Sequence, residues 1–513
     1  MNLFEKLFSI SDTADSLDSF LKENIQSINE LSNSVYKSII DSKDSIERFI
    51  LLKGNIIEHV DFQKSYNRAF ISILLDFCER FNFISATPKI YSILEKNKIN
   101  IGHRLQAALL FLYNIDCNSR LVERFELICE KIQTSIEFEE DNEKRAVSTF
   151  LNYYSIVIHD THLEFAEQVK HKIKNAVLND TYLFLKNPYI LDALSFDLLD
   201  LQSAFNRIQS VIDFILEKTD FVEPFFEKEE NEFLIEGTSE YSTILNKTST
   251  KFKSIRKISV NKINEMPEKD EIYYSLGRGV SILQNESQMF SYMKSFGSAH
   301  HAKMLSALKN IPFNEIKNNV ELFDWSCGQG LASMTFFEYL KDNSTNLNIE
   351  SLTLIEPSII CLKRAALHAR HFNKNCNITT ICKVINSINV KDIISHDINT
   401  KIHFFSNILD VDDFSITYLI DLIEKNCKGI NYFICVSPYI TDIKTDRVDS
   451  FCRYFTQFDT FKLLAEKTNG GRQDDDYWNC NNKYRGCMCP THPHFCNGKN
   501  KWTRVLRIFN VEI

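Results

Sequence analysis

The pattern of apolar and polar positions changes once along the chain, and the change divides it into two parts. Up to about residue 235, apolar residues recur at intervals of three and four with charged residues between them, as in 68–84, 104–115 and 187–219. This spacing is typical of amphipathic helices, and Asn187 followed by Pro188 is typical of an N-cap and a first helical residue. We therefore predict an all-α helical domain over residues 1–235.

After about residue 300, short apolar runs alternate with amphipathic stretches. The runs predict strands, and the stretches between them predict helices. Strands are expected at 320–326, 349–357, 376–386, 401–410 and 430–439, with helices at 359–372 and 415–427. Strands that alternate with helices at this spacing predict a parallel sheet covered on both faces.

The end of the chain departs from this alternation. The apolar runs 458–468 and 501–513 have an insertion between them and no helix of crossover length, which predicts a terminal antiparallel hairpin. The predicted fold class is therefore α plus α/β. An all-helical domain would be followed by a Rossmann-like doubly wound domain, 311–513, after a basic connector and pre-sheet helices, 236–310.

Length and charge are compatible with this division. A chain of 513 residues exceeds what one hydrophobic core usually serves. The net charge of −9 argues against a protein that coats nucleic acid through bulk positive charge. The segment 246–262 carries six Lys or Arg and no acid, so it is either a strip that contacts phosphates or a solvated connector.

The start of the chain and its cysteine usage predict a cytoplasmic protein. The first turns contain acids and no small-residue cleavage site, and no run of about 18 uncharged apolar residues predicts a membrane span. Most cysteines lie singly in apolar segments, for example Cys78, Cys129, Cys382 and Cys435. This distribution predicts reduced thiols in the core, without a disulfide framework.

A glycine-bearing turn follows the first predicted strand in LFDWSCGQGLASMTFF, residues 322–337. Missing side chains there would let backbone N–H groups and a helix N-terminus approach a ligand. Ligands of open parallel sheets lie outside the carboxyl ends of the strands, where Asp324 and Glu356 are expected. An acid at the end of the second strand can accept both hydroxyls of a ribose, as Glu356 would.

The loop and the acid at the end of the second strand resemble the cofactor-binding motif of the class I S-adenosylmethionine-dependent methyltransferases. DWSCGQG is similar to the D/E-x-G-x-G-x-G loop of that family at Asp324, Gly328 and Gly330, with Ser326 in place of the first glycine. The resemblance implies that Asp324 and the loop backbone hold the methionine portion of the cofactor, that Glu356 holds its ribose, and that Asn386 faces the adenine. The sheet of the family also ends in an antiparallel hairpin.

The serine in the loop is the main departure from the family pattern. We expect Ser326 to be tolerated because its position does not need a positive φ; a positive φ would strain it and put cofactor binding in doubt. Hydride transfer fits the loop less well, because GQGLAS lacks the third glycine of G-x-G-x-x-G.

Candidate catalytic groups follow the fourth predicted strand in FFSNILDVDDF. Asn407, Asp410 and the acids at 412 and 413 could bind an amine or amide substrate, or could cap and solvate the next helix. Asn407 is preferred because it stands at the strand end, with Asp410 second. Ahead of the glycine loop, basic side chains could meet a phosphate or the cofactor carboxylate, or could pack on a helix surface: Arg278, His300, His301 and Lys303.

A cysteine and histidine cluster lies in the predicted insertion of the hairpin, 478–498. Four thiols and two imidazoles at this density could bind structural Zn²⁺. An iron–sulfur cluster on the four cysteines, or a flexible thiol-rich loop, are the alternatives. The six residues are Cys480, Cys487, Cys489, Cys496, His492 and His494.

The resemblance implies a methyltransferase that binds S-adenosylmethionine and acts on a macromolecule. RNA is favoured over protein by similarity to other methyltransferases with helical extensions, and the helical domain would recognise the substrate or a protein partner. No membrane partner is expected. The alternative is an inactive methyltransferase-like scaffold or sensor in a larger complex, which Ser326 and the lack of a clear fourth-strand motif favour.

Overall fold

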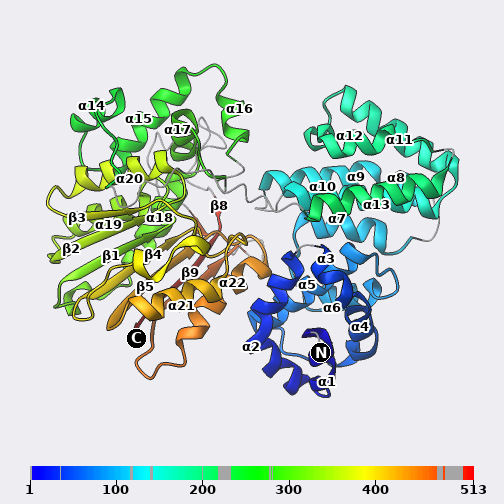
Figure 1. Ribbon diagram of the computed structural model, residues 1–513, viewed down its shortest axis with the longest axis horizontal. Helices are drawn as coiled ribbons and strands as arrows, with labels where there is room; N and C mark the ends of the chain where they lie inside the picture. Colours follow the sequence, from blue (N-terminus) through cyan, green and yellow to red (C-terminus); the bar gives the residue numbers. More distant parts are fainter. Residues whose placement is uncertain are drawn as a thin grey trace. The chain divides into compact units, whose positions relative to one another are not determined.

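A computed structural model describes residues 3–34, 36–115, 119–138, 143–198, 200–217, 233–276, 279, 281–470, 478–479 and 501–513. The chain forms two compact units. One consists of Met1–Phe226 with Thr441–Asp446, and the other of Glu227–Ile440 with Arg447–Ile513. In Figure 1 the first unit is helical and the second is built around a sheet.

The helical unit contains short and medium helices whose apolar faces form two core clusters. Its α-helices are α1 Leu3–Ile10, α2 Ala14–Asn33, α3 Tyr36–Ile39, α4 Lys43–Ile57, α5 Ser65–Phe81, α6 Thr87–Lys96, α7 His103–Leu112, α8 Ser119–Glu123, α9 Phe125–Phe138, α10 Glu143–Asp160, α11 Leu163–Leu178, α12 Pro188–Ser195 and α13 Leu201–Glu217.

The helical prediction for this half is confirmed, with one break inside the predicted segment 187–219. The Asn187 side chain accepts from the Tyr189 N–H and caps α12, as expected. The helix stops at Ser195, and Asp200 accepts from the Ser203 N–H at 3.0 Å, which starts α13. A second capping residue therefore divides what apolar periodicity alone presented as one segment.

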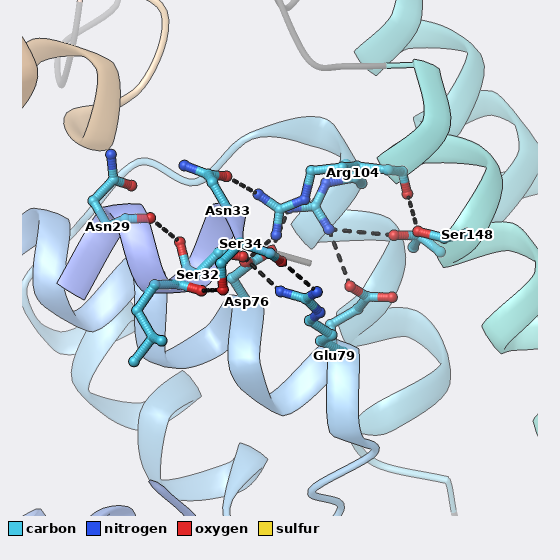
Figure 2. A network of polar contacts seen from close by, with 12 residues as sticks. Asn29, Ser32, Asn33, Ser34, Asp76, Glu79, Arg104 and Ser148 are labelled. Carbon is cyan, nitrogen blue, oxygen red and sulfur yellow. Dashed lines mark hydrogen bonds and ion pairs between the residues drawn. The ribbon is translucent and has the colours of Figure 1, made fainter. Parts of the chain in front are cut away.

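Buried charges join several helices of this unit. Figure 2 shows Arg104 facing Asp76 and Glu79, at 2.5 Å and 3.1 Å, and Arg145 also pairs with Asp76. Burial alone would raise the pKa of Asp76, but Arg145 and Arg104 lower it to about 2. These contacts connect α5, α7 and α10, and each buried charge has an opposite partner, as burial requires.

The sheet unit has seven strands in the order β3-β2-β1-β4-β5-β9-β6. The strands are β1 Val320–Trp325, β2 Ile349–Ile355, β3 Asn377–Ile381, β4 Thr400–Ser406, β5 Ile430–Ser437, β6 Lys462–Asn469 and β9 Arg504–Glu512. The first five are parallel, whereas β9 is antiparallel to both β5 and β6. A short ribbon of β7 Trp478–Asn479 and β8 Lys501–Trp502 is separate. The doubly wound sheet and its terminal hairpin are confirmed.

Helices cover both faces of the sheet (Figure 1). Successive strand residues alternate between the two core clusters, with Phe404 in one and Phe405 in the other. The helices of this unit are α14 Glu240–Asn246, α15 Phe252–Glu265, α16 Lys269–Tyr274, α17 Glu286–Ser295, α18 Gly297–Leu308, α19 Leu331–Asp342, α20 Ile359–Phe372 and α21 Ile416–Asn426, together with α22 Asp442–Phe455 from Arg447 onward.

Two details differ from the sequence prediction. Strand β3 ends at Ile381, five residues before the predicted end, and only short 3₁₀ turns, Ile385–Ser387 and Val390–Asp392, lead to β4. The buried Glu321 carboxylate holds this connection by accepting from the backbone and ring of His396 and from Asn399. Helix α22 was not predicted, because its sequence DIKTDRVDSFCRYF is highly charged in its first two turns.

The described cysteines are all unpaired, and all but Cys382 are buried, which confirms the prediction of core thiols for this part of the chain. Within the described ranges, no helix is both long and apolar enough to cross a membrane.

Candidate cofactor and substrate site

The site candidates meet at the carboxyl-terminal edge of the sheet. Register pairs Trp325 with Ile355 on one side and with Phe405 on the other. The residues that follow these three strand ends therefore lie beside one another. They are the 326–330 loop, Glu356 and Asn407. The backbone N–H of Glu356 donates to β3, and the backbone N–H of Asn407 donates to β5.

The loop backbone turns through three left-handed residues: Ser326 at φ 52°, Gly328 at φ 52° and Gly330 at φ 74°. The expectation that Ser326 avoids a positive φ is therefore wrong. Backbone strain destabilises a non-glycine residue in this conformation by roughly 1–2 kcal/mol. Residues held in this region tend to cluster at functional sites, where surrounding contacts maintain them.

The two glycines of the loop serve different needs. A Cβ on Gly330 would lie 3.2 Å from both the Cα and the Cβ of Ala365, so its absence permits close packing of the loop on α20. A Cβ on Gly328 would meet nothing within 4 Å. The space beside Gly328 is therefore open, and a ligand can approach the backbone there.

Asp324 connects the end of β1 to the first turn of α19. Its Oδ2 accepts from the Ser333 N–H at 3.1 Å and from the Ser333 hydroxyl at 2.5 Å. The side chain is 1% exposed, and burial raises its pKa to about 6 despite these hydrogen bonds. A carboxylate at this helix N-terminus is also favoured by the helix dipole.

Glu356 connects the end of β2 to the loop. One carboxylate oxygen accepts from the Gly328 N–H at 2.9 Å and the other from the Ser358 N–H at 3.0 Å. Burial raises its pKa to about 7. Each oxygen retains a lone pair beyond these bonds, so the carboxylate can still accept from two hydroxyls.

A chain of hydrogen bonds supports the loop from the α20 side. The Tyr241 hydroxyl in α14 lies 2.6 Å from His368 Nε2, and His368 Nδ1 lies 2.8 Å from the Gln329 carbonyl oxygen. Burial and the nearby Arg364 lower the pKa of His368 to about 3, so the ring is neutral. A neutral ring that donates from Nδ1 to the carbonyl must accept from Tyr241 at Nε2.

Arg364 fixes two segments that precede the sheet against α20. It pairs with Glu236 and donates to Glu286 at 2.7 Å, and its guanidinium lies 3.5 Å from the centre of the Tyr241 ring. The Gln329 side chain also donates to the Met289 carbonyl at 2.9 Å. Helices α14 and α17 are thus tied to the loop through side chains and backbone.

The candidate catalytic residues follow β4 and contact the end of β5. Asn407, at φ 61°, accepts from the ammonium of Lys303 in α18. Asp410 is 1% exposed, and its Oδ1 accepts from the Ser437 hydroxyl at 2.6 Å. Its Oδ2 is buried and has no hydrogen-bond partner among the described residues.

Other predicted residues are placed as follows. Asn386 follows β3, and its side-chain oxygen accepts from the Ser415 N–H before α21. His300 is half-buried, and burial together with Lys303 lowers its pKa well below the usual range. His301 pairs with Glu338 on α19 at 3.5 Å. Arg278 lies outside the described residues.

The basic segment 246–262 largely coincides with helix α15. Lys251 pairs with Asp342, Lys262 with Glu240, and Arg256 donates to the Met293 carbonyl. At least these three cations therefore serve contacts within the unit, which favours the structural interpretation of the segment.

The predicted zinc ligands lie outside the described residues: Cys480, Cys487, Cys489, Cys496, His492 and His494. Among the residues that are described, no group of three or more His, Cys, Asp or Glu side chains could hold a metal ion.

Sequence reasoning missed Ser333, Ser437 and the Tyr241–His368–Gln329 chain. Tyr241 and His368 are separated by 127 positions and Ser437 and Asp410 by 27, whereas Ser333 lies nine positions from Asp324 but in the next element. A lone histidine on an apolar helix face gives no local sign of such a partner. The loop residues and strand-end acids could be found because their spacing is local.

No protein-family model and no curated protein matches the chain. Solved structures that resemble it include a protein described as a class I S-adenosylmethionine-dependent methyltransferase from Listeria monocytogenes. The identity is 12%, the TM-score is 0.30, and the match covers 72% of this chain and 88% of the other.

Two further structures match at 8% identity. One is geranyl diphosphate methyltransferase in complex with GPP and sinefungin, with a TM-score of 0.25 and coverage of 53% of this chain and 99% of the other. The other is a modification subunit of a type I restriction enzyme from Vibrio vulnificus, with a TM-score of 0.27 and coverage of 76% and 81%. The strand order and register of the sheet unit identify its fold. By these, the sheet unit has the doubly wound, hairpin-ended fold of the class I S-adenosylmethionine-dependent methyltransferases.

Proposed function

We propose that the sheet unit binds S-adenosylmethionine at the 326–330 loop and transfers its methyl group to a macromolecule, with RNA favoured over protein. The observation that carries the proposal is the open space beside Gly328, whose N–H is held by the buried Glu356 carboxylate. A glycine backbone next to a strand-end acid suits a ligand that combines a ribose with a charged chain.

The residues present fit the parts of this cofactor. Glu356 would accept the ribose hydroxyls, while Asp324, Ser326 and the backbone at Gly328 and Gly330 would hold the methionine portion. Asn386, which follows the next strand, would face the adenine. When bound, the cofactor supplies an activated methyl group, and the protein contributes by orienting the nucleophile and removing its proton.

Incubation with tritium-labelled S-adenosylmethionine and separate RNA and protein fractions tests the proposal. We expect label in RNA from the wild type and a loss of roughly 100-fold or more with Asn407→Ala, since positioning and proton-transfer groups contribute on that scale. Label in protein alone would overturn the preference for RNA. An unchanged rate for Asn407→Ala would remove that residue from the site.

An inactive scaffold remains the second candidate function, favoured by the left-handed Ser326 in the loop. Its signature is cofactor binding of normal affinity with no transfer to either fraction. Transfer that depends on Asn407 would exclude it.

We also propose structural zinc in the 478–498 insertion, on the basis of its cysteine and histidine content alone. Metal analysis of the purified protein should find about one zinc per chain. Replacing Cys487 and Cys489 by serine should remove it, and metal-free protein with normal stability would contradict the proposal.

A further inference from the structure

A buried donor and a buried acceptor lie at the residues that follow β4. Lys303, 3% exposed, brings an ammonium to Asn407, and Asp410 has a buried carboxylate oxygen without a partner in the described residues. Asn407 and Asp410 flank one turn, and both contact the end of β5: Asn407 donates its N–H to the Val436 carbonyl, and Asp410 accepts from Ser437. A buried polar atom without a partner calls for an explanation, and a donor on a ligand supplies one.

The Lys303 contact restricts what Asn407 can recognise. An ammonium can only donate, so it must bond the carboxamide oxygen of Asn407. The second lone pair of this oxygen could still accept from an amine, but an amine becomes positively charged as it takes the methyl group, and it would do so beside the fixed charge of Lys303. The Asn407 amide nitrogen meanwhile donates to the Ser406 hydroxyl at 3.1 Å. An amine nucleophile is therefore disfavoured at this position.

A hydroxyl can interact with both groups at once, because it accepts through its oxygen and donates through its hydrogen. We propose that Lys303 and Asp410 form a site for a hydroxyl nucleophile, so that the methyl group is transferred to oxygen. In RNA the hydroxyl present on every nucleotide is the ribose 2′-OH. This inference rests on the proposed function.

The proposed step balances without a further reactant. The hydroxyl proton passes to Asp410 Oδ2, and the oxygen lone pair forms the bond to the methyl carbon. The electrons of the broken carbon–sulfur bond stay on sulfur, which becomes a neutral thioether. Lys303 stabilises the negative charge that develops on oxygen, as a preorganised cation in a water-poor site does well.

Alkaline hydrolysis of the labelled RNA distinguishes the two classes of product. The 2′ oxygen is the nucleophile of alkaline cleavage, so its methylation leaves an alkali-resistant dinucleotide. We expect the label in dinucleotides. Label in mononucleotides would show methylation of a base and overturn the inference while leaving the proposed function intact. Cofactor binding without transfer to RNA or protein would overturn both the inference and the proposed methyl transfer, and would favour the inactive scaffold.

Variants of the two residues test their roles. Lys303→Met keeps the length of the side chain, and Asp410→Asn keeps an acceptor for Ser437. We expect either to reduce transfer by roughly 100-fold, within the usual range for acid–base groups, with unchanged affinity for S-adenosylmethionine. Lys309→Met, at the exposed end of the same helix, is the control and should transfer at the wild-type rate. Full activity of both site variants would overturn the inference.

A binding measurement gives a readout that does not depend on turnover. RNA with a single 2′-deoxy nucleotide at the labelled position should bind the wild type roughly tenfold more weakly, the loss expected for a buried hydrogen bond to a charged group. The same RNA should bind Asp410→Asn with a smaller loss. Equal losses in the wild type and the variant would place the hydroxyl elsewhere and overturn the inference.

Discussion

At the scale of single residues, the site depends on groups whose backbone conformation or burial lowers the stability of the folded protein. Ser326, Gly328 and Gly330 are left-handed, and the carboxyl groups of Asp324 and Glu356 are buried with raised pKa values. Strain and buried charge of this kind lower stability, so proteins retain them where a ligand uses them. The sequence pattern located these residues but could not show the positive φ of Ser326, because Ser adopts many backbone conformations.

The two glycines provide a matched pair of substitutions. Gly330→Ala should destabilise the unit by roughly 2 kcal/mol or more, because strain at φ 74° adds to a clash with the Ala365 backbone. Gly328→Ala should cost only about 1 kcal/mol of strain, yet weaken cofactor binding roughly tenfold or more by filling the open space. Urea unfolding and calorimetry check both values; wild-type cofactor affinity in Gly328→Ala would place the cofactor elsewhere.

Asp324→Asn should stabilise the cofactor-free protein increasingly as the pH rises. The folded pKa of about 6 lies above the usual 3.8, so ionisation of Asp324 removes stability between these values. The free energy of unfolding of the Asp324→Asn variant should therefore exceed that of the wild type by an amount that grows by roughly 2 kcal/mol from pH 4.5 to 7.5. Urea unfolding at both pH values measures it. A gain independent of pH would show that Asp324 is not a buried acid.

At the scale of elements, local patterns predicted most of the sheet unit. Helix α20 has the predicted bounds, and the antiparallel β9 lies where the hairpin was expected. Elements held by distant contacts were not predictable: the short β3 and its helix-free connection depend on Glu321, and the support of the loop depends on α14. Hydrophobic periodicity carries no information about such partners.

Helix α14 should position the cofactor loop through Tyr241. Tyr241→Phe removes the hydroxyl that meets His368 and leaves the ring against Arg364. We expect affinity for S-adenosylmethionine to fall by roughly 5- to 10-fold, the scale of one hydrogen bond, with little change in the rate of transfer at saturation. A rate of transfer at saturation that falls by roughly 5- to 10-fold while the affinity is unchanged would contradict a role in positioning the loop.

At the scale of the whole molecule, two units have separate hydrophobic cores. Separate cores allow separate cooperative unfolding. The sheet unit would bind the cofactor, and the helical unit, whose described residues contain a buried Arg104 network, would recognise substrate or a partner.

Scanning calorimetry of the full chain should therefore show two transitions. S-adenosylmethionine at about 100 times its dissociation constant should stabilise one of them by about 2.7 kcal/mol and leave the other unchanged. Arg104→Met should lower the other transition, since removing one partner of a buried ion pair costs roughly 3–5 kcal/mol. A single transition shifted by both changes would contradict independent units.

The central claim is that the sheet unit binds S-adenosylmethionine through the loop and Glu356, and titration calorimetry tests it most directly. We expect micromolar binding by the wild type, a loss of roughly 100-fold in Glu356→Gln, and unchanged binding in Glu350→Gln, an exposed carboxylate at the other end of β2. Absence of binding to the folded wild type, or equal affinity in all three proteins, would contradict the account.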